Sequence, residues 1–198
     1  MKQTIIAAAM ASLFMASACS PKIEDANTGD FNYHVDRFAD IEVLRYKVPD
    51  FDSLSLQQKK LVYFLTEAAI WGRDILWDQN NVNNLAIRSL LEGVYTNFNG
   101  DKNSDDYKAF ETYVKQVWFG NGTHHHYSTD KFTPKFSREF LETQLAALPA
   151  GVAPENASEL VEVIFNPAVA AKRVNQEDGA DLIMTSANNL YEKGLTEK

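Results

Sequence analysis

Three consecutive histidines stand between Gly120 and Pro134 of this 198-residue chain, and their type and spacing come nearest to a metal site. In an extended strand, His124 and His126 would share one face, because alternate residues of a strand point to the same side. Asp130 would then have to fold back as a third ligand, and further side chains would have to orient the rings. The other interpretation is a polar surface loop or the wall of a substrate pocket, and we favour it.

Other catalytic signatures do not occur in the sequence. No histidine is followed by glutamate, so there is no His-Glu-x-x-His helix motif, and no nucleophile elbow, phosphate-binding glycine loop or dinucleotide fingerprint is present. Glu67, Arg73 and Asp74 could face a cleft from the first expected helix, although ion pairing on a solvated helix face is the favoured role. We therefore expect neither a catalytic residue nor a metal ligand in this chain.

Composition limits the classes of function. Hydrophobic residues make up 45% of the chain and aromatic residues 12%, which is typical of a globular body. The formal net charge is -8, and no cluster of lysine and arginine interrupts the acidic balance. A phosphate backbone would be repelled, so nucleic acid is excluded as the main partner.

The first residues differ from the rest and predict export. Lys2 precedes a mostly apolar run that is too short to span a bilayer, which favours a signal peptide over residues 1–18. Small residues 16–18 stand directly before Cys19, as in a bacterial lipobox, so we expect Cys19 to be acylated and the exported protein to be lipid-anchored to a bacterial membrane, at its periplasmic or outer-membrane face. The alternative is an ordinary signal peptide with a chance cysteine.

The elements that must position any site are mainly helices. Residues 19–36 are expected to be a lipidated tether, and residues 41–48 one strand whose partner comes either from elsewhere in this chain or from outside it. Amphipathic patterns, capping residues and Gly/Pro breaks predict helices that follow Ser53 or Ser55, Ser104 and Ser137, with others over 85–98, 159–165 and 181–191.

In the first helix, Leu61, Phe64 and Leu65 recur at helical spacing, which predicts an amphipathic helix. At the end, residues 194–198 are either the start of a further helix or a charged, frayed tail.

Several segments together resemble one known family. They are Ala68–Gly72 within a helix rich in leucine and tyrosine, Asn97-Phe98, Val117-Trp118, Tyr127 and Lys131–Pro134. In this order and spacing they resemble the N-terminal part of dipeptidyl peptidase III, and most of all its bacterial lipoprotein-like branch. The resemblance covers residues 40–198 and includes no catalytic signature.

The resemblance implies a two-lobed zinc exopeptidase that releases dipeptides from the N-terminus of oligopeptides. In that family the zinc and its ligands belong to a later helical lobe, so residues 37–198 correspond to part of the N-terminal lobe, truncated relative to the family, with a mainly α, minor β (α+β) fold. Zinc would belong to the complete enzyme and would not be bound by this chain. The implied partners are an oligopeptide substrate and the missing catalytic lobe.

Site residues carried over from the resemblance are few. An aromatic residue that precedes the Lys-Phe-x-Pro stretch lines the substrate cleft in the family, and Tyr127 has that place here. His126 and Asn121 are its neighbours and are included as substrate-binding candidates. The rival interpretation is a non-enzymatic, lipid-anchored lipoprotein that binds a periplasmic peptide or partner through the loop 120–134.

Overall fold

A β-hairpin opens the part of the chain that the computed structural model describes, residues 31–192 and 194–197. Strand β1 (His34–Phe38) pairs antiparallel with β2 (Ile41–Leu44), and Ala39 adopts a left-handed conformation in the turn. The strand expected over 41–48 is therefore shorter, and its partner is local: β1 begins within the segment assigned to a tether. The signal peptide and Cys19 lie outside the described residues.

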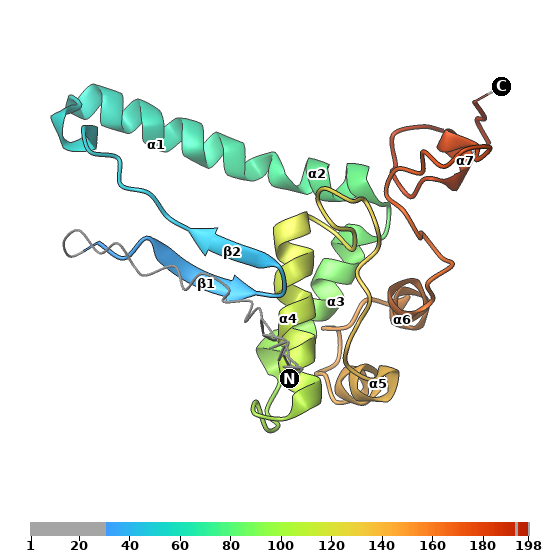
Figure 1. The fold of residues 1–198 in the computed structure, drawn as a ribbon. Helices are drawn as coiled ribbons and strands as arrows, with labels where there is room; N and C mark the ends of the chain where they lie inside the picture. Colours follow the sequence, from blue (N-terminus) through green and yellow to red (C-terminus); the bar gives the residue numbers. More distant parts are fainter. Residues whose placement is uncertain (1–30, 193, 198) are drawn as a thin grey trace, which may run out of the picture. The chain divides into compact units, whose positions relative to one another are not determined.

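Most of the chain that follows is helical, as the sequence predicts (Figure 1). Ser55, Ser104 and Ser137 each accept a backbone N–H of the first turn, which confirms them as N-caps. After a short 3₁₀ helix (Phe51–Ser53), the helices are α1 (Leu56–Trp71), α2 (Arg73–Asn80), α3 (Asn84–Asn97), α4 (Asp105–Gly120), α5 (Arg138–Ala146), α6 (Ala157–Phe165) and α7 (Leu182–Thr185).

The hydrophobic core lies among α3, α4, α5 and α6. Side chains that recur at three- and four-residue spacing on each helix meet there, and Trp77 of α2 joins them. Phe136, from the segment before α5, packs edge-on against Phe110 and Tyr113 of α4, with ring centroids 5.4 and 5.5 Å apart. The core thus fixes α4 and the segment that returns from its end toward α5.

The hairpin is attached to the outer side of α4. Lys115 of α4 forms a 2.8 Å ion pair with Asp36 of β1, and its ammonium group lies 5.8 Å from the ring centroid of Phe38. Phe38 also packs edge-on against Phe119 near the end of α4. These contacts bring the turn at Ala39 and Asp40 to the C-terminal end of α4.

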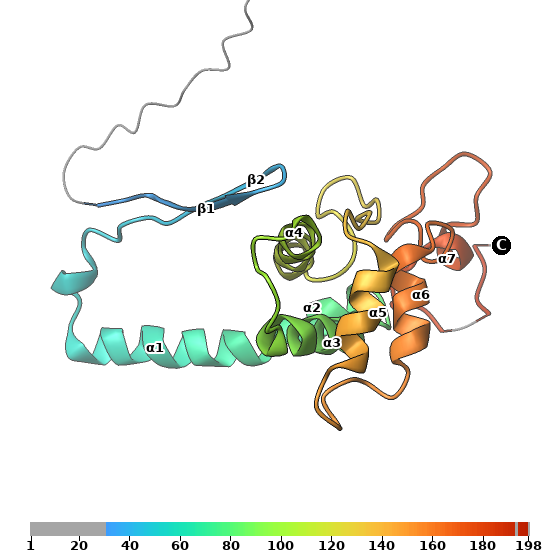
Figure 2. The ribbon, with the colours of Figure 1, turned by 90° about the horizontal axis from the view of Figure 1, so that it is seen from below.

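Helix α1 departs from the expected amphipathic arrangement. It leads away from the core helices (Figures 1 and 2), and none of its residues is buried. The apolar face predicted from Leu61, Phe64 and Leu65 exists, but these side chains are 58%, 65% and 60% exposed. This face packs on no core in the described residues, and α1 exposes apolar side chains on its other sides as well.

The C-terminal segment is less helical than the sequence predicts. Only α7 forms, with Asp181 as its N-cap, and the helix expected through Tyr191 ends at Thr185. Backbone N–H groups of 187–189 instead donate to the carbonyls of Lys172, Arg173 and Gln79, at 2.9, 3.1 and 2.8 Å. These tertiary bonds replace the i to i−4 bonds that a longer helix would need.

Residues 194–197 contain no helix either. Among the described residues, no helix combines the length and the apolar character that crossing a membrane requires. The fold of these residues is thus mainly α with a small β part, as expected.

Candidate functional site

The loop that carries the three histidines begins where α4 ends. Asn121 adopts a left-handed conformation with φ of 50°, and Gly122 donates its N–H to the carbonyl of Val117 at 3.0 Å. The carbonyl of Asn121 accepts a 3.1 Å hydrogen bond from the side chain of Asn80 in α2. Asn121, a substrate-binding candidate from the resemblance, therefore closes helix α4 and ties the loop to α2.

Two buried polar residues, Asn84 and Thr123, fix the base of the loop. Asn84, at the start of α3, is fully buried and donates to the carbonyl of Trp77 at 3.1 Å. Its side-chain oxygen accepts from the N–H and hydroxyl of Thr123, at 3.3 and 3.5 Å. One buried amide thus connects α2, α3 and the loop.

His124 is an interior residue of this base. Its side chain is only 2% exposed, and Nε2 lies 2.7 Å from the carbonyl oxygen of Ala170. Nδ1 lies 3.4 Å from the hydroxyl of Thr123. Burial lowers the pKa of His124, opposed by the hydrogen bond to Ala170, and this shift favours the neutral ring. The neutral ring donates through Nε2 and joins the loop to residues 170–173, called here the 170 segment.

His125 shapes the turn that follows. Its Nδ1 accepts hydrogen bonds from the backbone N–H groups of Tyr127 and Ser128, at 3.2 and 3.1 Å. Nε2 then donates to the carboxylate of Asp40 in the hairpin turn, at 3.2 Å. Because both ring nitrogens are engaged in this way, His125 acts as a fixed support for the turn rather than as a free base.

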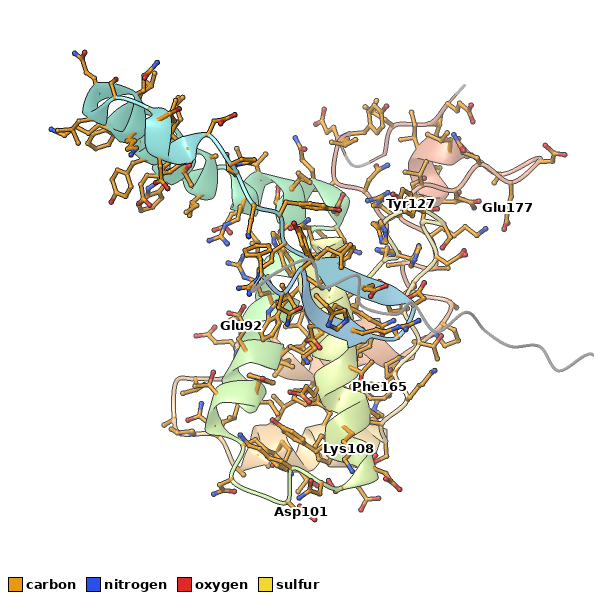
Figure 3. All side chains as sticks on the ribbon, turned by 60° about the vertical axis from the view of Figure 1, so that its left-hand side comes forward. Glu92, Asp101, Lys108, Tyr127, Phe165 and Glu177 are labelled. Atoms are coloured by element: carbon orange, nitrogen blue, oxygen red, sulfur yellow. The ribbon has the colours of Figure 1, made fainter. Side chains whose placement is uncertain are left out.

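The turn that His125 stabilises carries His126 and Tyr127. The ring of His126 packs edge-on against Phe119, with centroids 5.0 Å apart, and lies 4.2 Å from the ring of Tyr127. Desolvation, followed by the neighbouring His125, lowers the pKa of His126, and the Nδ1 of His126 is buried without a partner among the described residues. Tyr127 is 84% exposed at the tip of the turn (Figure 3). The loop thus presents one exposed aromatic ring, that of Tyr127, which packs against the ring of His126.

This geometry does not match the metal site considered from the sequence. The segment 126–128 is a turn rather than an extended strand, and His124 points its Nε2 at Ala170. Asp130 instead lies 3.6 Å from the ammonium group of Lys172. In residues 31–192 and 194–197, no group of three or more histidine, cysteine or acidic side chains could hold a metal ion. The residues present do not fit zinc.

The side chain of Lys131 joins the loop to the C-terminal end of α6. Its ammonium group donates to the carbonyls of Val163, Asn166 and Val169, at 2.6, 2.6 and 2.8 Å. These carbonyls lie at and beyond the C-terminal end of α6, where helix carbonyls lack intrahelical partners and a positive charge is favoured. Burial lowers the pKa of Lys131, and the Glu162 carboxylate opposes that shift.

Backbone hydrogen bonds complete the fixing of the loop. The N–H of His125 donates to the carbonyl of Asp130, and that of Arg173 to the carbonyl of Thr129, both at 2.8 Å. The guanidinium of Arg173 donates to the carbonyl of His126 at 3.2 Å. The turn is therefore held from the hairpin, from α6 and from the 170 segment.

A cavity of about 530 Å³ opens between this loop, α4 and Ala39 of the hairpin turn. Its volume lies within the range of small-molecule sites. Its lining includes Tyr113 and Phe132, together with His125 and Ser128 on either side of the His126-Tyr127 pair. Lys108, Thr112, Gln116 and Lys135 are among its polar lining residues.

No model of a known protein family matches the chain, and no curated protein matches it. The structure brings His126 and Tyr127 together and places Asn121 at the base of the same loop. Glu67 and Arg73 lie exposed, and Asp74 pairs with Arg88 of α3 at 2.8 Å, which agrees with ion pairing on a helix surface for Asp74.

Sequence reasoning missed the residues that support the turn. Asp40 is 85 positions from His125, and Arg173 is 47 positions from His126. No local pattern connects such distant residues. Lys131 is different, since it lies in a segment quoted for the resemblance, although nothing there indicated that it caps α6.

Proposed function

We propose that this chain is part of an exported, lipid-anchored zinc exopeptidase that releases dipeptides from the N-terminus of oligopeptides. In that proposal the chain is part of the N-terminal lobe of a two-lobed enzyme and supplies a wall of the substrate cleft. The observation that supports it best is Tyr127, an 84% exposed aromatic ring on a turn held by hydrogen bonds from three directions. The resemblance to dipeptidyl peptidase III gives the activity.

The contribution of this chain would be binding and orientation. An exposed aromatic ring on a fixed turn can pack against a substrate side chain with little loss of conformational entropy. His126 backs the ring, and His125 fixes the backbone on which both stand. Because the described residues do not fit zinc, the chemistry would belong to another lobe of the protein.

Replacing Tyr127 with alanine tests this role in a longer, catalytically complete product of the gene. We expect kcat/KM for peptide substrates to fall about 5- to 150-fold, which corresponds to about 1–3 kcal/mol of lost apolar contact. The melting temperature should change little, because the ring is almost fully exposed. A dipeptidyl-naphthylamide assay and a thermal melt measure the two effects.

Tyr46, which is 74% exposed in the segment after β2, provides a matched control. Tyr46→Ala removes another largely exposed ring and should leave kcat/KM unchanged. Equal losses in both variants, or normal kcat/KM in Tyr127→Ala, would contradict the assignment of Tyr127 to the cleft.

A second candidate function is favoured by the cavity beside the turn. Its lining comes from α4, the hairpin turn and the loop after α4, which together could hold a peptide or small partner. The protein would then be a non-enzymatic, lipid-anchored binding lipoprotein. Peptide binding by residues 20–198 alone, with no dipeptide release by any longer product, would favour this function over the peptidase.

We further propose that Cys19 carries the lipid anchor, supported by the apolar run and the small residues that precede it. Cys19→Ser should abolish labelling by a radioactive or clickable fatty acid and move the protein from the membrane fraction to the soluble fraction. Cys19→Ala serves as a second substitution with the same expected result. Retention of either variant in membranes would reject acylation as the anchor.

A further inference from the structure

The cavity beside the loop follows one face of α4. The residues of α4 that line it are Lys108, Ala109, Thr112, Tyr113 and Gln116. At a rise of about 1.5 Å per residue, this face extends about 12 Å from its first residue to its last. Figure 3 shows Lys108 near the start of α4 and Tyr127 beyond the other end of the helix. The cavity therefore has room for a small organic molecule that lies along the helix.

Two lysines line the end of the cavity nearest the start of α4. Lys108 lies on the helix, and Lys135 lies on the segment that leads to α5. The carboxylate of Asp106 accepts the backbone N–H of Ser137 at 2.8 Å, which holds this segment against the first turn of α4. Within residues 31–192 and 194–197, neither ammonium group has an ion-pair or hydrogen-bond partner. This end of the cavity therefore carries positive charge that the described chain does not neutralise.

The other charged side chains of the lining already have partners. Lys131 donates to three carbonyls at the end of α6, and Asp130 lies 3.6 Å from the ammonium group of Lys172. His125 donates to the carboxylate of Asp40 at 3.2 Å. A ligand in the cavity thus meets two unpaired cations and, among the described lining residues, no unpaired carboxylate. This distribution of charge is complementary to an anion.

Tyr113 contributes a buried polar group to the same lining. Its side chain is 1% exposed, and its hydroxyl group is buried without a hydrogen-bond partner in the part of the chain that the structure describes. Burial raises the pKa of Tyr113, so the hydroxyl keeps its proton and can donate it. Buried hydroxyl groups are normally hydrogen-bonded. An acceptor on a ligand in the cavity would complete this one.

The rest of the lining combines apolar and hydrogen-bonding side chains. Ala109 and Phe132 offer apolar contact, and Thr112, Gln116 and Thr133 offer hydrogen-bonding groups. Phosphate groups are commonly held by arginine or by the backbone N–H groups of glycine-rich loops. Neither arginine nor glycine lines the cavity in the described residues. The lining suits a carboxylate on a partly apolar body better than it suits a phosphate.

We propose that this cavity binds a small organic carboxylate that also carries a carbonyl group. The anionic group lies at Lys108 and Lys135, the body extends along α4, and the hydroxyl of Tyr113 donates to the carbonyl oxygen of the ligand. The proposal rests on the second candidate function, binding in this cavity, and names the chemical class of the ligand. It does not require the peptidase, because Tyr127 is not part of the cavity lining.

Hippurate and its neutral amide, hippuramide, test the need for the anion, because the two differ only at the carboxylate. In calorimetric titration of the full chain in detergent, we expect hippurate to bind about 5- to 10-fold more tightly than hippuramide at low salt. Raising the salt to about 0.5 M should remove most of this difference, since salt screens exposed charges. Equal affinities at low salt, or no binding of hippurate, would overturn the proposal.

Substitution of the two lysines locates the anion. Lys108→Met and Lys135→Met should each weaken hippurate binding about 3-fold and leave hippuramide binding unchanged. Lys60→Met removes an exposed lysine of α1, which contributes nothing to the cavity lining, and should change neither affinity. Equal losses in all three variants would show general attraction by the protein's charge and would overturn the assignment of a site.

Tyr113→Phe tests the hydroxyl group. It should weaken the binding of hippurate and hippuramide alike, by about 3- to 10-fold, because both compounds carry an amide carbonyl that can accept its hydrogen bond. The melting temperature of the ligand-free variant should not fall, since the described chain loses no hydrogen bond. A lower melting temperature with unchanged affinities would show that the hydroxyl serves the fold, and would overturn its role in binding.

A dipeptide separates two sources of the same ligand chemistry. Phenylalanylglycine has the ring, the amide and the carboxylate of hippurate, but it adds an ammonium group that the two lysines would repel. We therefore expect it to bind more weakly than hippurate, and tighter binding would overturn the preference for acids without an amine.

Failure of this proposal can be distinguished from failure of the peptidase. Hippurate binding together with no dipeptide release by any longer product would keep the cavity site and reject the peptidase. Dipeptide release by a longer product, with no hippurate binding, would reject the cavity site and keep the peptidase.

Discussion

Replacing Gly122 with alanine should destabilise the folded chain by about 3–5 kcal/mol, because two independent costs meet at this position. Gly122 has φ of +144°, a conformation that costs an L-residue about 1–3 kcal/mol. A Cβ there would also overlap the side-chain amide of Asn84. That amide cannot move without losing its hydrogen bonds to Trp77 and Thr123, and each buried group left unpaired costs about 1–3 kcal/mol.

Gly151→Ala separates the two costs. Gly151 has φ of +82°, and a Cβ there would meet nothing within 4 Å, so only the conformational cost of about 1–2 kcal/mol applies. Urea unfolding followed by circular dichroism measures both variants against the parent chain. If Gly122→Ala costs no more than Gly151→Ala, the contact with Asn84 does not hold the base of the loop.

The helices were predictable where local chemistry and packing agree. Helix α4 follows its N-cap Ser104 and ends at Gly120 as expected, since its cap, its acidic first turn and its apolar spacing all favour the same bounds. The helix expected to Tyr191 failed because its backbone N–H groups bond to other segments. Periodicity cannot report such long-range competition, which is decided by residues that lie far away in the sequence.

For helix α1, the sequence predicted the conformation but not the packing. Its N-cap at Ser55 and its helical character followed from the sequence, yet its surroundings did not. Spacing of Leu61, Phe64 and Leu65 predicts an apolar face without indicating which polypeptide covers it. The β-hairpin was missed in a similar way, since residues 34–36 were grouped with a polar tether although β1 alternates exposed and half-buried side chains.

The sequence predicted that the candidate site is a loop, but not how its side chains are arranged. Histidines at successive positions suggested either alternate-face ligation or a polar loop, and the turn at 126–128 gives each ring a different environment. His124 is buried, His125 supports the backbone and His126 backs Tyr127. Those roles depend on Asp40 and Ala170, which no local motif connects to the loop.

Replacing Lys131 with methionine should be nearly as costly as changing the base of the loop. The ammonium group of Lys131 donates to three carbonyls at the end of α6, and methionine keeps much of the side-chain volume while removing every donor. Hydrogen bonds from a charged group contribute about 1.5–3 kcal/mol each. Burial lowers the pKa of Lys131, so part of that gain offsets desolvation. We expect a net loss of about 2–4 kcal/mol.

Lys135→Met provides a control four residues along the same segment. Lys135 is exposed, and its ammonium group has no hydrogen-bond or ion-pair partner among the described residues, so its loss should change stability by less than about 0.5 kcal/mol. Hydrogen exchange adds a local readout, because Lys131→Met should accelerate exchange in α6 and the 123–131 loop more than in α3. If both variants have the same stability, the three carbonyls are satisfied by water and Lys131 does not hold the loop against α6.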